Sequence, residues 1–264
     1  MIALQDMLTI LSGGIVGLVL GLIGGGGSII AVPLLLYVVG IGSPHMAIGT
    51  SAIAVALSAL FNLVNHARSG KVKWPCAMSF SAAGIAGAWA GSSLAILVPG
   101  DNLLALFGGL MIVVGIVMAL RKDAEGNPDV RLTFSTAREL LPLLLAMGFG
   151  VGALAGFFGI GGGFLIVPGL MLATGMPIAN AIATSLVAVT AFGATTAGNY
   201  ALSGLVDWRI AALFVAGGVV GGIAGTWAGQ KLAGSKGTLS TIFAGSVILI
   251  GVYVTWKGLA PYFA

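Results

Sequence analysis

Two clusters of glycine interrupt apolar stretches of the sequence, at residues 24–28 and 159–163. Each glycine costs about 1 kcal/mol relative to alanine in a helix, so we expect a helix to break at each cluster and to restart near Ser28 and Gly163. A restarted helix exposes free backbone N–H groups at the positive end of its dipole, which can bind an anion without a cationic side chain. The candidate ligand residues are Gly25, Gly26, Gly27, Ser28, Gly161, Gly162 and Gly163.

Small polar side chains recur in the apolar run that follows each cluster. Thr50 and Ser51 lie near the start of one run, and Thr184 and Ser185 occupy the same place in the other. Such hydroxyls either donate to a ligand or bond to the carbonyl groups of their own helix, and the sequence leaves both interpretations open. Asn65 and Asn199 lie where these runs end; we interpret them as caps or interfacial residues and keep them as candidates. The remaining polar residues of these runs are Asn62, His66, Thr195, Thr196 and Tyr200, and we expect His45 to be a turn residue without a role.

Several kinds of reactive group are missing from the sequence. No Asp, Glu, Lys or Arg falls in the middle of an apolar run, which argues against a proton or sodium relay built from intramembrane carboxylates. There is no Ser-His-Asp or Cys-His set, no metal-ligand cluster, and no lysine after the first glycine cluster to make a nucleotide loop. Cys76 is the only cysteine. We therefore expect no enzymatic activity, no metal site and no cofactor.

The composition predicts a membrane protein. Of 264 residues, 58% are hydrophobic and only 7% are charged, against roughly 25% in an ordinary soluble domain. So few charges cannot cover a water-exposed surface of this size, so the lipid bilayer must be the main partner of the chain. The net charge of +4 comes from Lys and Arg in short polar gaps, a pattern typical of membrane loops and not of nucleic-acid binding.

Ten apolar runs alternate with these gaps. Most approach the roughly 20 residues needed to span a bilayer as a helix, which predicts an all-α polytopic membrane protein. When residues 8–39 and 140–174 are each counted as one membrane segment, the first and fifth of eight segments are the ones broken by glycine. The runs cover residues 8–23, 29–39, 46–64, 77–98, 103–120, 140–158, 164–174, 178–202, 210–232 and 239–256.

The chain reads as an internal duplication of about four membrane segments. Gly13, Gly17, Gly21 and Pro33 recur 135 positions later, and Thr50, Asn65 and Trp74 recur 134 positions later. We predict a first membrane half at 1–120, a charged connecting loop at 121–139 and a second membrane half at 140–264. Rows of glycine spaced by four, including 13–21, 148–156 and 217–229, are interpreted as faces for close helix packing.

Topology has two solutions. As one helix, residues 8–39 would measure about 48 Å, against about 30 Å of hydrocarbon. The segment is either a single broken span, giving eight spans with both halves in one orientation, or a re-entrant hairpin, giving three full spans per half and inverted halves. The positive-inside rule gives the same balance for both, nine basic residues inside and two outside. We favour inverted halves, because a glycine cluster inside an apolar block is typical of a discontinuous transporter helix.

The sequence resembles the TauE/SafE family of sulfite and organosulfonate exporters over nearly its whole length. The resemblance rests on the glycine cluster with its following proline at 24–33 and 159–168, on the helix after each, and on the motif Ser-Gly-x-Val-x-Trp at 69–74 and 203–208. It implies a multi-pass permease of the inner membrane with about eight segments. It also implies outward transport of a small sulfur-containing anion, such as sulfite, a sulfonate or sulfoacetate.

These observations predict a transporter that holds its anion near the midplane and exposes it alternately to the two sides. A passive anion channel and an uptake permease for sulfate-like anions are the alternatives; uptake of metal ions is weakened by the missing ligand clusters. The oligomeric state is left open between a monomer and a homodimer.

Overall fold

The computed structural model describes residues 2–23, 25–67, 70–120, 136–159, 163–231 and 236–260. These residues form ten α-helices, with no strand among them, which confirms the predicted all-α membrane fold. The α-helices are α1 (Ile2–Ile23), α2 (Ala31–Pro33), α3 (Pro44–Ala67), α4 (Trp74–Leu97), α5 (Gly100–Leu120), α6 (Ala137–Phe158), α7 (Gly163–Thr174), α8 (Ile178–Leu202), α9 (Trp208–Lys231) and α10 (Lys236–Leu259). A 3₁₀ helix η1 (Gly25–Ile30) and a π-helix η2 (Leu34–Val38) flank α2.

The predicted glycine rows pack helices backbone to backbone. A Cβ at Gly13, Gly17 or Gly21 of α1 would enter the main chain of α9 at Phe214, Gly218 or Gly222. Both residue series rise together, so α1 and α9 run parallel. Helices α6 and α4 make the same kind of contact, since a Cβ at Gly148, Gly152 or Gly156 would enter the main chain at Phe80, Gly84 or Ala88. We call these two backbone contacts, α1 on α9 and α6 on α4, the glycine seams. The interpretation of these rows as packing faces is confirmed.

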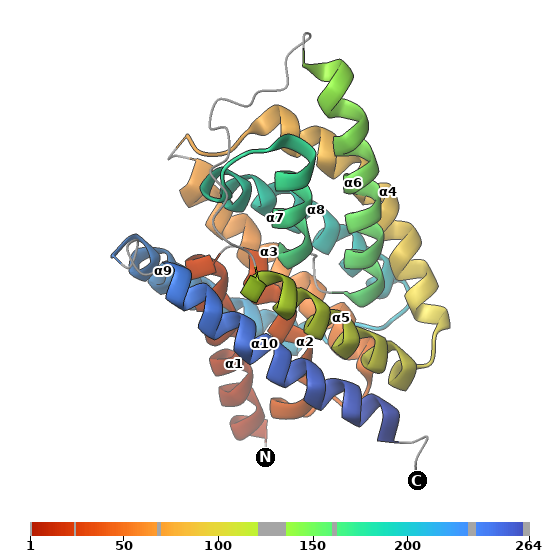
Figure 1. The fold of residues 1–264 in the computed structure, drawn as a ribbon. Helices are drawn as coiled ribbons and strands as arrows, with labels where there is room; N and C mark the ends of the chain where they lie inside the picture. Colours follow the sequence, from red (N-terminus) through yellow and green to blue (C-terminus); the bar gives the residue numbers. More distant parts are fainter. Residues whose placement is uncertain are drawn as a thin grey trace.

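The other long helices pair antiparallel (Figure 1). In the α3–α8 pair, Gly49 lies beside Tyr200, and Ala56 lies beside Gly193. In the α5–α10 pair, Gly115 lies beside Ile248, and Gly258 lies beside Ala105. The last residues of α5 and α10 therefore lie at opposite ends of this helix pair.

The first glycine-broken segment is a hairpin. Its outgoing arm, α1, ends beside Gly222 and Thr226 of α9, while α9 continues to Lys231. The returning arm, η1 through η2, ends beside the start of α1. There Gln5 Nε2 donates a hydrogen bond of 3.2 Å to the carbonyl of Val39. We call residues 2–38 hairpin 1, and the corresponding pair α6–α7 hairpin 2.

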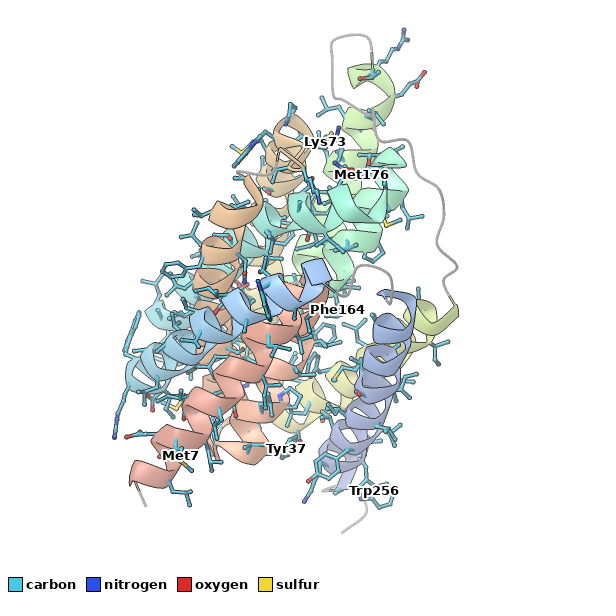
Figure 2. The ribbon with its side chains drawn as sticks, turned by 90° about the vertical axis from the view of Figure 1, so that its left-hand side faces the viewer. Met7, Tyr37, Lys73, Phe164, Met176 and Trp256 are labelled. Carbon is cyan, nitrogen blue, oxygen red and sulfur yellow. The ribbon has the colours of Figure 1, made fainter. Side chains whose placement is uncertain are left out.

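The two hairpins enter from opposite ends of the molecule. Figure 2 shows Met7, Tyr37 and Trp256 at one end and Lys73 and Met176 at the other, with Phe164 between them. We call the first end the N-terminal face and the second the Lys73 face. Of the two topologies that the sequence allowed, this arrangement is the re-entrant one, with opposed halves. The reciprocal packing of α1 on α9 and of α6 on α4 is what a duplication would produce, although the duplication itself stays a prediction.

The surface of the described part is that of a chain surrounded by lipid. Seven of its helices are long and apolar enough to cross a bilayer: α1, α3, α4, α5, α6, α8 and α9. Large apolar side chains point outward from them, for example Leu202, which is 81% exposed, and Val220, which is 71% exposed. In water such exposure would be costly, whereas in hydrocarbon it is not.

Candidate functional site

The second glycine cluster breaks its segment where the sequence predicts. Helix α6 ends at Phe158, and Gly159 follows in the left-handed conformation, with a φ of 66°. Its N–H donates to the carbonyl of Gly156 at 3.3 Å, which closes the last turn. A Cβ at Gly159 would enter the side chain of Ile48, so the break lies against α3. Helix α7 begins at Gly163, which is buried, as predicted.

The first cluster folds differently from the prediction. The helix does not restart at Ser28, because residues 25–30 form the tighter 3₁₀ helix and α2 begins only at Ala31. The lack of a Cβ at Gly27 lets η1 lie close against α1, because a side chain there would enter the backbone of Leu20. After Pro33, which has no N–H to donate, the helix widens into η2. The returning arm of hairpin 1 is thus irregular, whereas that of hairpin 2 is a regular helix.

The two broken segments meet inside the protein. Helices η1 and α7 contact each other, and the residues that follow the breaks belong to the core: Ser28, Ile29 and Ile166 are fully buried, and Phe164 is 3% exposed. Of the predicted ligand residues, Gly25 and Gly26 belong to η1. Gly161 and Gly162 lie outside the described residues. The structure therefore brings hairpin 1 and hairpin 2 together at the place where their helices are interrupted.

Thr50 and Thr184 have reciprocal partners that sequence reasoning missed. The hydroxyl oxygen of Thr50 accepts a hydrogen bond of 3.0 Å from the N–H of Asp207, and that of Thr184 accepts one of 3.1 Å from the N–H of Lys73. Asp207 and Lys73 both occupy the fifth position of the Ser-Gly-x-Val-x-Trp motif. Each motif is therefore anchored on a threonine of the other half. The signal in the sequence was the equal offset between the two threonines and the two motifs.

The neighbouring serines bond mainly to their own helices. Ser51 Oγ donates to the carbonyl of Ile48 at 2.9 Å and lies 3.4 Å from the carbonyl oxygen of Gly159. Ser185 Oγ donates to the carbonyl of Ile182 at 2.8 Å. The first serine therefore connects α3 to the break in hairpin 2, and both hydroxyl protons are engaged with carbonyl groups.

Asn199 is a contact between helices. Its Nδ2 donates to Ser92 Oγ at 2.8 Å and to Ser93 Oγ at 2.9 Å, both on α4. Asn62 makes a similar contact in the first half, where its Oδ1 accepts a bond of 3.3 Å from Thr226 on α9. The side chain of Asn65 lies outside the described residues.

His45 and Tyr200 lie together at the N-terminal face. The expected turn at His45 is wrong, because α3 begins at Pro44 and His45 belongs to its first turn. The imidazole lies beside the ring of Tyr200, with 6.4 Å between the ring centres. Tyr200 is fully buried. The sequence could not predict that these two side chains are neighbours, since 155 residues separate them.

The described interior holds no ionic side chain. Its buried polar residues are all Ser, Thr or Asn, apart from the tyrosine and histidine just described. No group of three His, Cys, Asp or Glu that could hold a metal ion occurs among the residues described. The ion pair that the structure records, Arg209 with Asp6, connects α9 to α1 at the exposed N-terminal face. An anion in this interior would meet backbone dipoles and hydroxyls.

Comparison with known proteins identifies the family of the chain. The sequence model of the family described as sulfite exporter TauE/SafE matches residues 9–254. A probable membrane transporter protein of Xylella fastidiosa (strain 9a5c) is 48% identical over 263 residues, which cover 98% of each chain. The probable membrane transporter protein YunE of Bacillus subtilis (strain 168) is 28% identical over 270 residues, covering 96% of this chain and 98% of its own. No solved structure matches the chain significantly. The chain belongs to the TauE/SafE family of membrane transporters.

Proposed function

We propose that this transporter exports a small sulfur-containing anion, such as sulfite, a sulfonate or sulfoacetate, across the inner membrane by alternating access. The anion is held between hairpin 1 and hairpin 2 by the backbone N–H groups of residues 25–28 and 161–163. The observation that carries this proposal is that two interrupted segments, entering from opposite faces, contact each other in the core through η1 and α7. Discontinuous helices of opposed repeats are where transporters commonly bind their substrates.

The electrostatics of this region favour a negative solute. The first N–H groups of a helix have no partner within it, so the amino end of α7 carries about half a positive charge, and its first residue, Gly163, is buried. No carboxylate lies among the buried side chains described, so nothing there repels an anion. In surroundings of low dielectric constant, these dipoles act more strongly than they would in water.

The hydroxyl groups divide into two roles. The protons of Ser51 and Ser185 are engaged with carbonyl groups, so these serines shape the site. Thr50 and Thr184 act as acceptors in their bonds to Asp207 and Lys73, so their protons remain able to donate to the anion. Asn199 supports the site by holding α4 against α8.

The distribution of basic residues gives the orientation. In the proposed topology, nine of the eleven Lys and Arg are assigned to the side of the Lys73 face by their place in the sequence, and Arg209 and Lys257 to the side of the N-terminal face. The positive-inside rule then puts the Lys73 face in the cytoplasm. An anion leaving the cell would first meet this basic face, whose potential attracts it.

Alternating access needs parts that move as rigid bodies. The glycine seams of α1 on α9 and of α6 on α4 bring backbone against backbone, so each pair moves as one body. We propose that these two bodies rock about the central α3–α8 pair and expose the region between η1 and α7 first to one face and then to the other.

The test is anion-dependent thermal stabilisation of the purified transporter, with sulfite, isethionate, sulfate and chloride as probes. We expect stabilisation by sulfite or the sulfonate at lower concentrations than by chloride. The variants Gly26→Leu and Gly161→Leu should lose this stabilisation, because a side chain there blocks the N–H groups. Gly150→Leu is the matched control, since it adds the same side chain on α6 where a Cβ would meet open space.

Unchanged affinity in both blocking variants would overturn the assignment of the site. Stabilisation by sulfate alone would favour the uptake permease, and single-channel currents in a planar bilayer would favour the passive channel. Sulfite efflux from proteoliposomes that shows no such currents would support the exporter.

A further inference from the structure

Four buried polar atoms have no hydrogen-bond partner among the residues that the structure describes. They are Nδ1 of His45, Oγ of Ser81, Oγ1 of Thr196 and the hydroxyl oxygen of Tyr200. Three of the four belong to the α3–α8 pair. His45 and Tyr200 face each other with ring centres 6.4 Å apart, and Thr196 lies one helical turn from Tyr200 on α8. Unpartnered polar groups therefore concentrate at the end of this helix pair that lies toward the N-terminal face.

The hydroxyl of Tyr200 is unfavourable where it stands. The side chain is fully buried, and a buried hydroxyl without a partner is destabilising. Phenylalanine would fill the same space without that cost. The contacts within the protein therefore explain the ring of Tyr200 but not its hydroxyl, which is explained if a solute accepts its hydrogen bond.

The surroundings restrict the kind of solute. The tyrosine and threonine hydroxyls can both donate, and so can Nδ1 of His45 when it carries the proton. The nearest carboxylate on the adjoining connection is that of Asp207. Its Oδ1 accepts a bond of 3.0 Å from the N–H of Ile210 at the start of α9, so it belongs to the connection and not to the group of unpartnered atoms. A cluster of potential donors that contains no carboxylate of its own fits a small oxyanion.

We propose that Tyr200, His45 and Thr196 form a second binding station for the transported oxyanion, between the site at the hairpins and the N-terminal face. This inference rests on the proposed function. Along α3, His45 lies little more than one turn before Thr50, so an anion leaving the hairpins toward this face reaches Tyr200 next. With the Lys73 face in the cytoplasm, this is the exit side.

The station has no counterpart of the same composition in the other half. At the offset of 134, Tyr200 corresponds to His66, and His45 corresponds to Ala179. The exit side therefore has a tyrosine–histidine pair that the cytoplasmic side lacks. A binding station on one side only gives the two half-cycles different affinities for the anion.

The test uses Tyr200→Phe, with Tyr253→Phe as the matched control. Tyr253 lies at the same end of the molecule but is 47% exposed and packs edge-on against Tyr37. Thermal unfolding of the detergent-purified transporter is followed with and without sulfite. Without sulfite, Tyr200→Phe should be at least as stable as the wild type, since the hydroxyl has no partner to lose. The sulfite concentration for half-maximal stabilisation should rise about tenfold in Tyr200→Phe and stay unchanged in Tyr253→Phe.

A second pair of variants tests His45. The amide of His45→Asn can place a donor near the position of Nδ1, whereas His45→Leu cannot, so only the leucine variant should weaken sulfite binding. Equal affinity of Tyr200→Phe and the wild type would overturn the station, and so would a lower melting temperature of Tyr200→Phe without sulfite, which would show that the protein itself holds the hydroxyl. If the wild type is not stabilised by sulfite or a sulfonate, the proposed function fails and the station with it. Normal binding by the wild type and by every variant rejects the station alone.

Discussion

Two threonine hydroxyls connect the halves of this transporter, each through one hydrogen bond. Thr50 and Thr184 each accept the N–H of the residue before the tryptophan that starts α9 or α4. Gly70 and Gly204, both with positive φ, turn the chain back after α3 and α8 so that these N–H groups reach the threonines. The Ser-Gly-x-Val-x-Trp motif can therefore be understood as a turn with a fixed docking point on the opposite half.

The variant Thr184→Val tests this anchor. Valine keeps the shape of threonine but leaves the N–H of Lys73 without its acceptor, which we expect to cost about 1–3 kcal/mol of stability. Thr190→Val on the same helix is the control, because its hydroxyl donates only to the carbonyl of Leu186, which is in its own helix. The measurement is thermal unfolding in detergent, and equal shifts for the two variants would contradict the anchor.

At the level of helices, glycine permits two parallel seams that no larger residue allows. The carbonyls of Gly218 on α9 and Gly84 on α4 occupy the space of a side chain at Gly17 and Gly152. Without a hydrophobic drive between helices in lipid, such close packing is a main source of association. The seams also keep each hairpin attached to a full-length helix of the other half.

We expect Gly17→Ala to destabilise the protein and Gly14→Ala to leave it as stable or more so. At Gly17 the new methyl would collide with the backbone of Gly218, and overpacking typically costs about 1–3 kcal/mol. At Gly14 it would lie 3.7 Å from the carbonyl oxygen of Gly217, an ordinary contact, and alanine favours the helix. The measurement is the thermal unfolding of both variants. A Gly17→Ala protein as stable as Gly14→Ala would show that α1 and α9 can move apart without a loss of stability.

At the scale of the molecule, opposed hairpins determine how the chain lies in the membrane. Helix α10 ends beyond Trp256 at the N-terminal face (Figure 2), and α5 ends at the opposite end of the α5–α10 pair, because the two helices pair antiparallel. Both hairpins stop short of the face opposite their entry, so each interruption lies inside the protein, where irregular backbone is tolerated in a membrane.

Cysteine labelling tests the proposed orientation in intact cells. In a Cys76→Ser background, Ser203→Cys should react with a membrane-impermeant thiol reagent, because Ser203 is exposed at the N-terminal face. Lys71→Cys, exposed at the Lys73 face, should react only after the cells are permeabilised. The opposite pattern would invert the orientation and turn the basic face outward.

Much of this molecule could be predicted from local signals. The apolar runs predicted the helices, although most helices start two to six residues earlier, as α1 does at Ile2, because their first turns hold polar or interfacial residues. The glycine clusters predicted the breaks, and glycine spacing predicted the packing faces. These features depend on residues close together in the chain, where backbone entropy and hydrophobicity act directly.

Other properties depended on contacts between distant segments. The charge rule could not distinguish a broken span from a hairpin, whereas the proximity of Gln5 to Val39 did. The roles of Thr50 and Thr184 required knowing which loop lies opposite each hydroxyl, and the pair of His45 with Tyr200 required the register of α3 on α8. The sequence by itself determined where the helices form, where they break and which faces allow close approach, because those are local properties. Only the tertiary structure decided the direction of each arm and the partner of each polar group, because hydrogen bonds and packing act between atoms that the chain brings together only when it folds.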